Sequence, residues 1–252
     1  MKKIFPVALA LSVTLFFTAC TEKTDDFEPV LSDSYLPSQV GKFITYRLDS
    51  TVFTQQGRAE ERHVYQQKDV VDAAITDGLG RPSYRVYRYI RDSAGITPWR
   101  SLGSYFITPT TGAVEVVDDN LRFIPVITPV RTGTSWKGGR YIATDAYGAQ
   151  YLFGNDDDIA DWDFTYSEIG EMVTLNGKTY SDVATVQGID ESLNVPVTTP
   201  TSFASRSLYK SQYAKGIGLI FQEYILWEYQ PNPNGTPYKI GFGIKRTILD
   251  HN

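Results

Sequence analysis

The amino-acid sequence predicts an all-β protein, a single antiparallel β-sandwich or curved half-barrel of about ten to twelve strands with little helix. Three observations support this prediction. The 252-residue chain contains 17 Tyr, 13 Phe and 4 Trp but only two Met, and aromatic residues favour strands. Stretches that alternate apolar and polar residues recur between turn-forming stretches, as in half-buried strands. The regular exchange of strands and helices that marks a parallel sheet does not occur.

The first nineteen residues have the layout of a secretory signal peptide. Lys2 and Lys3 precede an apolar run over residues 4–17, and two small residues follow it. The run is shorter than the ~20 residues that a helix needs to span a bilayer. We therefore predict that residues 1–19 are cleaved on export, and a retained membrane-spanning helix is the alternative.

The chain's single cysteine, Cys20, stands where such a leader is cut. The run Phe17-Thr18-Ala19-Cys20 resembles the lipobox of bacterial lipoproteins, whose cysteine receives a diacylglycerol before cleavage. Phe17 departs from the leucine that is usual at its position. The resemblance implies lipidation at Cys20, and two or three acyl chains anchor a protein stably where one is marginal. An unmodified thiol beside an ordinary cleavage site is the alternative.

Residues 20–38 are predicted to be a flexible tether that starts at the lipidated cysteine. They are mostly polar and acidic and show no periodicity, which favours a mobile chain. Lys23 with Asp25 and Asp26 is similar to the signal that sends Bacteroidota lipoproteins to the outer face of the outer membrane, although Thr24 interrupts it. The resemblance implies a lipid-anchored protein of the bacterial outer membrane, with the surface and the periplasmic face both open.

The charge of the chain excludes some classes of partner. The formal net charge is −5, and loss of the leader with Lys2 and Lys3 makes it more negative. Because no basic cluster offsets this balance, we expect no binding to nucleic acid. Acylation of Cys20 would leave no free thiol, which excludes disulfide bonds and cysteine catalysis.

Several strands are predicted in the first half of the chain. Residues 44–52 alternate cleanly, as in a half-buried strand. Residues 61–76 form a long β-type run whose imperfect alternation predicts a bulge or a curved strand. Shorter strands are predicted over residues 105–107, 113–117 and 121–127.

Residues 84–91 are predicted to form a strand that carries a candidate binding surface. Val86 and Ile90 belong to its apolar face, whereas Tyr87 and Tyr89 lie between arginines on the other face. An Arg/Tyr face can bind a glycan or a phosphate. Its ordinary structural role is a solvated sheet face with stacked side chains, and we favour that interpretation.

The stretch after these strands contains a third candidate for ligand contact. Residues 133–139 are predicted to form a loop that presents Trp136. Residues 141–153 are predicted to form a hairpin around Tyr147-Gly148, because strand-forming residues flank this pair.

The densest acidic run, residues 155–163, suggests a cation site, because calcium takes oxygen ligands. The candidate ligands are Asp156, Asp158 and Asp161. The run lacks the alternating spacing, the glycine and the closing glutamate of a calcium loop, and Asp156 also fits a helix cap. We therefore predict a structural turn and no bound metal.

The best-defined local feature is a hairpin around Asn176-Gly177. Both residues tolerate the positive φ of a two-residue turn. This turn predicts that Val173 lies opposite Tyr180 on the paired strand.

Two apolar rows dominate the last third of the chain. In residues 219–229, the apolar side chains at odd positions are predicted to form the buried face, with Gln222 and Glu228 on the opposite face. In residues 238–248, even positions form the buried row. Such rows stabilise a fold by about 1.5–3 kcal/mol per large side chain.

Two motifs near the ends of the domain suggest a family. Residues 213–220 (YAKGIGLI) and 40–46 (VGKFITY) resemble turn and strand motifs of exported bacterial β proteins and lipoproteins of uncharacterised families. The resemblance implies an antiparallel and often strongly curved sheet, sometimes wrapped around a helix or an apolar groove. It brings no catalytic residue.

The chain offers few residues for catalysis. Its two histidines are His63, inside a predicted strand, and His251, near the end of the chain. Neither fits a serine triad or a zinc site, and no phosphate-binding or dinucleotide-binding glycine loop occurs. No cofactor is therefore expected. A pair of carboxylates for glycoside hydrolysis stays open, because their separation depends on the fold.

Together these observations favour a noncatalytic lipoprotein of the cell envelope, with one β domain over residues 39–252 that binds a glycan, a peptide or a partner protein. The alternative is a carrier of lipid or another hydrophobic ligand with a lipocalin-like curved sheet. A hydrolase with an Asp/Glu pair is a third hypothesis.

Overall fold

The computed structural model describes residues 31–36, 38–153 and 159–252. Helix in these residues is limited to the 3-10 helix η1 (Ser32–Tyr35), the α-helix α1 (Gly148–Tyr151) and the 3-10 helix η2 (Ile159–Asp161). None of these described helices is long and apolar enough to cross a membrane. The predicted signal peptide and Cys20 lie outside the described residues.

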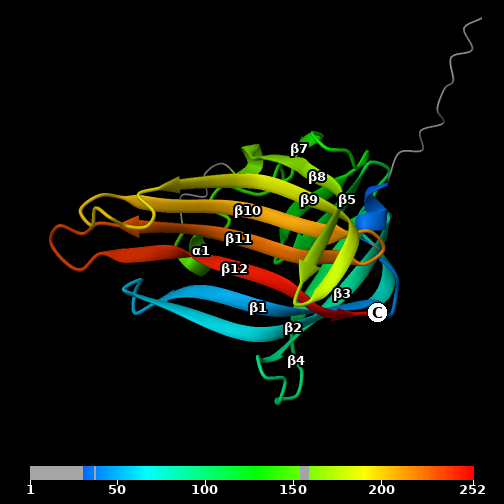
Figure 1. Cartoon of the computed structure of the whole chain (residues 1–252), viewed down its shortest axis with the longest axis horizontal. Helices are drawn as coiled ribbons and strands as arrows, with labels where there is room; N and C mark the ends of the chain where they lie inside the picture. The colour runs from blue at the N-terminus through cyan, green and yellow to red at the C-terminus, as the bar shows by residue number, and fades with distance from the viewer. Residues whose placement is uncertain (1–30, 37, 154–158) are drawn as a thin grey trace, which may run out of the picture.

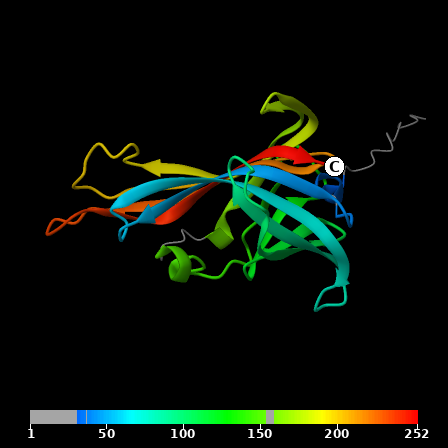
Figure 2. The same cartoon turned by 90° about the horizontal axis from the view of Figure 1, so that it is seen from below.

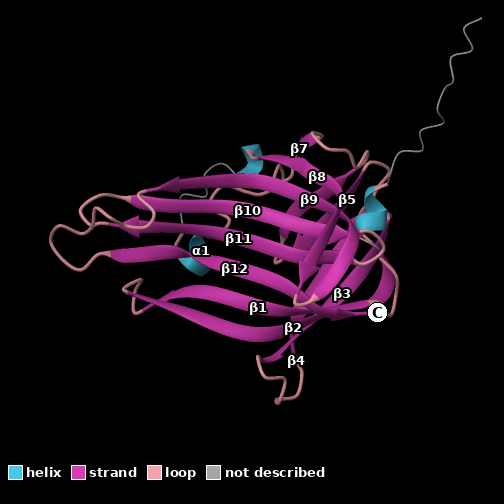
Figure 3. Cartoon of the chain, in the orientation of Figure 1, coloured by secondary structure: helices cyan, strands magenta, loops and turns pink. Residues whose placement is uncertain are grey.

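The described residues form one antiparallel sheet of twelve strands (Figures 1 and 3). The strands are β1 (Phe43–Thr54), β2 (Ala59–Thr76), β3 (Pro82–Asp92), β4 (Arg100–Pro109), β5 (Ala113–Asp118), β6 (Leu121–Ile127), β7 (Ser135–Lys137), β8 (Asp163–Leu175), β9 (Lys178–Leu193), β10 (Ala204–Ala214), β11 (Gly218–Gln230) and β12 (Tyr238–His251). The order in the sheet is β6-β5-β4-β3-β2-β1-β12-β11-β10-β9-β8-β7. The predicted all-β fold class is confirmed, in the form of a curved, nearly closed sheet.

The two halves of the chain meet in the middle of the sheet. The strands β1–β6 follow one another in sequence, and so do β7–β12. The two series are joined where β1 pairs with β12, from Ile44 opposite His251 to Thr51 opposite Gly243. The first and the last strand of the domain are therefore central strands.

The two edges of the sheet approach each other without pairing as strands. The Ile124 N–H of β6 donates to the carbonyl of Gly138 at 2.8 Å. The hydroxyl of Tyr166, on β8, accepts from the Ile127 N–H at 2.8 Å and donates to the Ile127 carbonyl at 2.7 Å. These contacts close the barrel across the gap between β6 and β8, which protects the edge strands.

The main hydrophobic core lies inside the curve of the sheet. Alternation along the strands turns one side chain in two toward this interior, where Val114, Val126, Phe164, Val186 and Leu226 are fully buried. Figure 2 shows the curled part of the sheet, from which β1, β2 and β9–β12 run out as a flatter extension. The interior of the curled part is the place where a ligand site can form.

Part of the segment predicted as a tether packs against the sheet. Ser32 and Tyr35 of η1 are buried. The Ser32 N–H donates to Thr128 Oγ1 at 3.0 Å, and the Gly216 N–H donates to the Ser34 carbonyl at 2.7 Å. The motif at residues 213–220 thus forms the β10–β11 turn and also contacts the chain that enters the domain.

Two local predictions are confirmed. Asn176-Gly177 joins β8 to β9, with φ of 50° and 77°, and Val173 lies opposite Tyr180. The imperfect alternation of β2 corresponds to a register shift between Val71 and Ala73 where β2 pairs with β3.

The predicted hairpin over residues 141–153 is wrong. This segment is a loop that contains α1, and it lies inside the curve of the sheet. The Tyr224 hydroxyl donates to that of Tyr147 at 3.0 Å, and the Tyr151 ring lies 4.4 Å from that of Phe242. Burial of these aromatic rings against β11 and β12 replaces the strand pairing that local pattern predicted.

The predicted buried face of β11 is also wrong. Ile220, Tyr224 and Leu226 are the buried apolar residues of this strand, whereas its odd-numbered aromatic and aliphatic residues are only half-buried. Because large apolar residues occupy both faces, alternation alone does not select one. A register shift between Gln212 and Tyr213 on β10 interrupts the regular pairing at the start of β11. Because such an irregularity changes which side chains face inward, Gln222 points into the interior.

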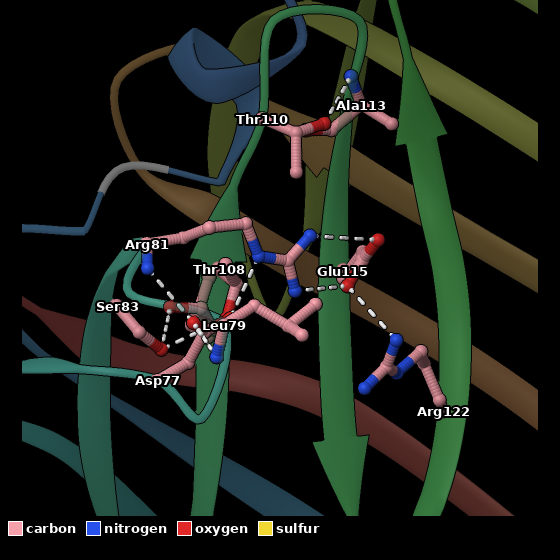
Figure 4. A network of polar contacts seen from close by, with 10 residues as sticks. Asp77, Leu79, Arg81, Ser83, Thr108, Thr110, Ala113, Glu115 and Arg122 are labelled. Atoms are coloured by element: carbon pink, nitrogen blue, oxygen red, sulfur yellow. Dashed lines mark hydrogen bonds and ion pairs between the residues drawn. The ribbon is translucent and has the colours of Figure 1, made fainter.

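A polar network fixes the β2–β3 turn against β5 (Figure 4). Arg81 donates to both carboxylate oxygens of Glu115, at 3.3 and 2.9 Å, and its Nε donates to Asp77 at 2.7 Å. Arg122 lies 3.6 Å from Glu115. The hydrogen bonds of Glu115 and Asp77 raise the pKa of Arg81 above its usual value. These charged hydrogen bonds hold the β2–β3 turn against β5.

Candidate ligand-binding chamber

The interior of the curved sheet contains a chamber of about 160 Å³, called here the first chamber. Apolar side chains from strands on both sides of the curve make up much of its wall, and they include Ile44, Val71, Val86, Ile107, Phe123 and Leu219. Partly exposed Leu36, Lys42 and Ile217 also line it. A cavity of about 150 Å³ accepts a group of the size of benzene.

A second chamber of about 440 Å³ adjoins the first. Gln150 and Tyr151 of α1 line it together with residues of β11 and β12. The two chambers share six residues, called here the partition: Arg88, Asp118, Phe123, Tyr209, Gln222 and Arg246. The partition therefore separates the mainly apolar first chamber from a second chamber whose wall also contains polar residues such as Ser50, Gln67 and Asp119.

Arg88 is an arginine of the partition with only 15% of its side chain exposed. It donates to both oxygens of Asp118, at 3.2 and 2.8 Å, and its Nε lies 3.7 Å from Asp69. Burial would lower the pKa of Arg88, but Asp69 and Asp118 outweigh burial and raise it. Its charge is thus fixed and compensated by two carboxylates.

Arg246 is held in a different way. Its Nε donates to Gln67 Oε1 at 3.4 Å, and its Nη1 donates to Gln222 Oε1. Among the described residues, no carboxylate lies within 4.0 Å of this guanidinium, and no hydrogen bond is made by Nη2. Arg246 lines both chambers.

Neutral hydroxyl groups surround the partition. Tyr105 donates to Asp69 at 3.1 Å, and Tyr46 donates to the Leu219 carbonyl at 3.0 Å. The pKa of each of these two tyrosines is raised well above the usual value for tyrosine. Burial is the main cause, and the nearby charge of Asp69 is the second. These phenols therefore stay protonated and act as hydrogen-bond donors.

The candidates Tyr87 and Tyr89 lie together, as predicted, but on the outer face of β3. Their ring centroids are 6.3 Å apart, and Arg85 lies 4.9 Å from the centre of the Tyr87 ring. Arg85 also forms an ion pair with Asp72 at 2.6 Å. Neither tyrosine lines the chambers.

Trp136 belongs to β7 and not to a loop. Its Nε1–H donates to the Ile124 carbonyl at 2.7 Å, and its ring lies 4.7 Å from that of Tyr166. These contacts give Trp136 a structural role at the gap between the two sheet edges.

The other candidates form no site within the described residues. Asp161 lies in η2, where its backbone carbonyl accepts from the Lys137 ammonium at 2.6 Å. Asp156 and Asp158 fall outside the described residues. In the part of the chain that the structure describes, no three metal-ligating side chains cluster. His63 lies on β2 beside Glu61, with 3.0 Å between Nε2 and the carboxylate.

Sequence reasoning missed the charged residues of the partition. A signal for them was present, because Arg88 interrupts the apolar row of Val86 and Ile90, and Arg246 interrupts the row of Ile244 and Ile248. A charge within the buried row of a strand is costly unless it is paired. Such an interruption therefore marks a polar site inside the fold.

Comparisons with known proteins add little to this geometry. No protein-family model matches the chain, and no curated protein sequence matches it. A solved structure described as "a putative exported protein with YmcC-like fold" from Bacteroides fragilis matches with 13% identity and a TM-score of 0.30, over 88% of this chain and 100% of its own. A structural agreement this low carries no argument about this chain.

Proposed function

We propose that this protein is a noncatalytic lipoprotein of the bacterial outer membrane that holds a small apolar or amphipathic molecule inside its curved sheet. The first chamber carries this proposal. Ligand sites in proteins are concave and mostly apolar, with a few polar groups that fix orientation, and the first chamber combines an apolar wall with the partition. Anchoring through Cys20 rests on the lipobox resemblance.

The proposal can be tested by replacing a residue of the first chamber's wall with a larger one that fills the chamber. Leu219 is a half-buried residue of β11 that lines this chamber, so Leu219→Trp should occupy its space. Ile225→Trp is the matched control, because Ile225 is half-buried on the same strand but lines neither chamber. We expect Leu219→Trp to weaken binding of 1-octanol to the full chain by at least tenfold, measured by calorimetry, while Ile225→Trp binds as the wild type does.

The outcome separates binding from folding. Thermal unfolding of both variants shows whether the added ring has damaged the fold. If the wild-type chain binds no 1-octanol, and solvent extraction of the purified protein releases no small molecule, the proposal fails. Equal binding by the wild type and a folded Leu219→Trp variant would place the ligand elsewhere.

A second candidate function uses the outer face of the sheet. Tyr87 and Tyr89 present two half-buried rings side by side there, and aromatic rings with arginines are common in surfaces that bind glycans, peptides or proteins. Loss of glycan-array or pull-down signal in a Tyr87→Ser, Tyr89→Ser double variant would support this function. No signal with the wild-type chain would count against it.

A further inference from the structure

We infer that Arg246 is the receptor for a single carboxylate at the polar end of an amphipathic ligand, whose apolar part occupies the first chamber. The inference rests on the proposed function and deepens it. Three conditions must be met. Arg246, unlike Arg88, must have no carboxylate partner, and its guanidinium must be held in a fixed position. It must also lie beside the apolar wall of the first chamber.

The two arginines of the partition differ in their partners, because no carboxylate lies within 4.0 Å of the Arg246 guanidinium among the described residues. Asp69 and Asp118 both lie close to Arg88, at 3.7 and 2.8 Å. Arg246 has only neutral amide oxygens as partners among the described residues. A half-buried guanidinium next to apolar walls lacks full hydration, and an anion would supply the missing interactions.

The two amides hold the guanidinium in a fixed position. Gln67 donates through its Nε2 to Asp69 at 2.9 Å, which turns its Oε1 toward Arg246. Gln222 donates through its Nε2 to Ser211 at 3.4 Å, which turns its Oε1 in the same way. Within the described part of the chain, the N–H groups of Nη2 make no hydrogen bond. Because the side chain is already ordered, binding of an anion costs little further entropy.

The surroundings favour a carboxylate over a dianion. Asp69 and Asp118 stand in the same interior and would repel a second negative charge, although they are paired with Arg88. One unmatched guanidinium matches one carboxylate. Since Arg246 lines the first chamber together with Ile44, Val86 and Leu219, an acyl or aryl group attached to that carboxylate can lie against apolar walls.

The test compares octanoate with 1-octanol, which has the same number of carbons but no charge. The full chain is placed in lipid nanodiscs, and heats from empty nanodiscs are subtracted. We expect octanoate to bind the wild type about 10- to 100-fold more tightly than 1-octanol, the factor typical of a charge-assisted hydrogen bond. Octyl phosphate and free phosphate serve as the dianion probes and should bind more weakly than octanoate.

Variants assign the effect to one side chain. Arg246→Gln should reduce octanoate affinity by about 10- to 100-fold and leave 1-octanol affinity within about twofold. Lys245→Gln is the matched control, because it removes a charge from the adjacent residue of β12, whose exposed side chain points to the outer face. This control should bind both probes as the wild type does.

The outcomes distinguish this inference from the proposed function. If the wild type binds 1-octanol as tightly as octanoate, the carboxylate site is wrong and the apolar chamber remains. The same conclusion follows if Arg246→Gln, with normal binding of 1-octanol, keeps its octanoate affinity. A preference for octyl phosphate overturns the choice of a carboxylate. Binding of neither octanoate nor 1-octanol overturns the proposed function and this inference together.

Discussion

Arg88 and Arg246 share the partition between the chambers, yet their surroundings give them opposite roles. Arg88 is locked between two carboxylates and stacks 4.8 Å from the Tyr105 ring centre. Arg246 faces two amides. An arginine that is paired with carboxylates, such as Arg88, helps to hold the interior in one arrangement. An arginine without a carboxylate partner, such as Arg246, can bind the anionic group of a ligand. We therefore expect changes at Arg88 to affect folding and changes at Arg246 to affect binding.

Arg88→Met should destabilise the protein strongly. The change leaves Asp69 and Asp118 in the interior without their cation, and breaking a buried ion pair from one side costs about 3–5 kcal/mol. Arg85→Met is the matched control on β3, because the Arg85–Asp72 pair is more exposed, at 38% and 25%. Its loss should cost about 1 kcal/mol or less. Urea unfolding measures both, and equal losses would contradict the assigned role of Arg88.

At the scale of elements, the gap between β6 and β8 is closed by one backbone hydrogen bond, from Ile124 to Gly138, and by side-chain hydrogen bonds, without a strand ladder. Tyr166 is completely buried and makes two hydrogen bonds to the backbone of Ile127. Trp136 adds a third bond, to the backbone of Ile124. The barrel is thus held shut at specific points, which makes the contribution of each one measurable.

Tyr166→Phe should loosen this closure without changing the shape of the core. Two hydrogen bonds are lost, at about 0.5–1.5 kcal/mol each, so the free energy of unfolding should fall by about 1–3 kcal/mol. The Ile127 amide should also exchange its hydrogen faster. Tyr229→Phe is the control, because the Tyr229 hydroxyl bonds the Pro200 carbonyl in an exposed position. Unchanged exchange at Ile127 would show that Tyr166 is not the closing contact.

Much of the strand layout could be predicted from the sequence, because alternation and turn chemistry act locally. Asn176-Gly177 fixed the register of its hairpin. Prediction failed where tertiary contacts decide: β11 has apolar residues on both faces, and the rings of Tyr147 and Tyr151 bury against the sheet. The partition brings together residues of β3, β5, β6, β10, β11 and β12, and local patterns do not contain the arrangement of these strands.

For the whole molecule, the proposed anchor sets where the chambers act. The chain that enters the domain through η1 continues to Lys42, and Leu36 and Lys42 line the first chamber. The helix η1 at the described start of the domain and the first chamber therefore lie at the same end of the sheet.

Cys20→Ala should release the protein from the membrane. The wild-type chain should incorporate a clickable fatty acid and sediment with the outer membrane, because two or three acyl chains anchor stably. The variant should lose both properties while its purified domain unfolds at the same temperature. Label that persists in Cys20→Ala would show that the lipid is attached elsewhere.

The central pairing of β1 with β12 has a consequence for how the chain is made. Asn252 accepts from the Phe43 N–H at 2.7 Å, so the ends of the domain touch across more than two hundred residues. Contacts of such high sequence separation form slowly, because the intervening chain must first be ordered. In the strand order, β12 is the element through which β1–β6 and β7–β11 become one sheet. Strand pairing between the two halves of the sheet therefore depends on β12, the strand that joins β1 to β11.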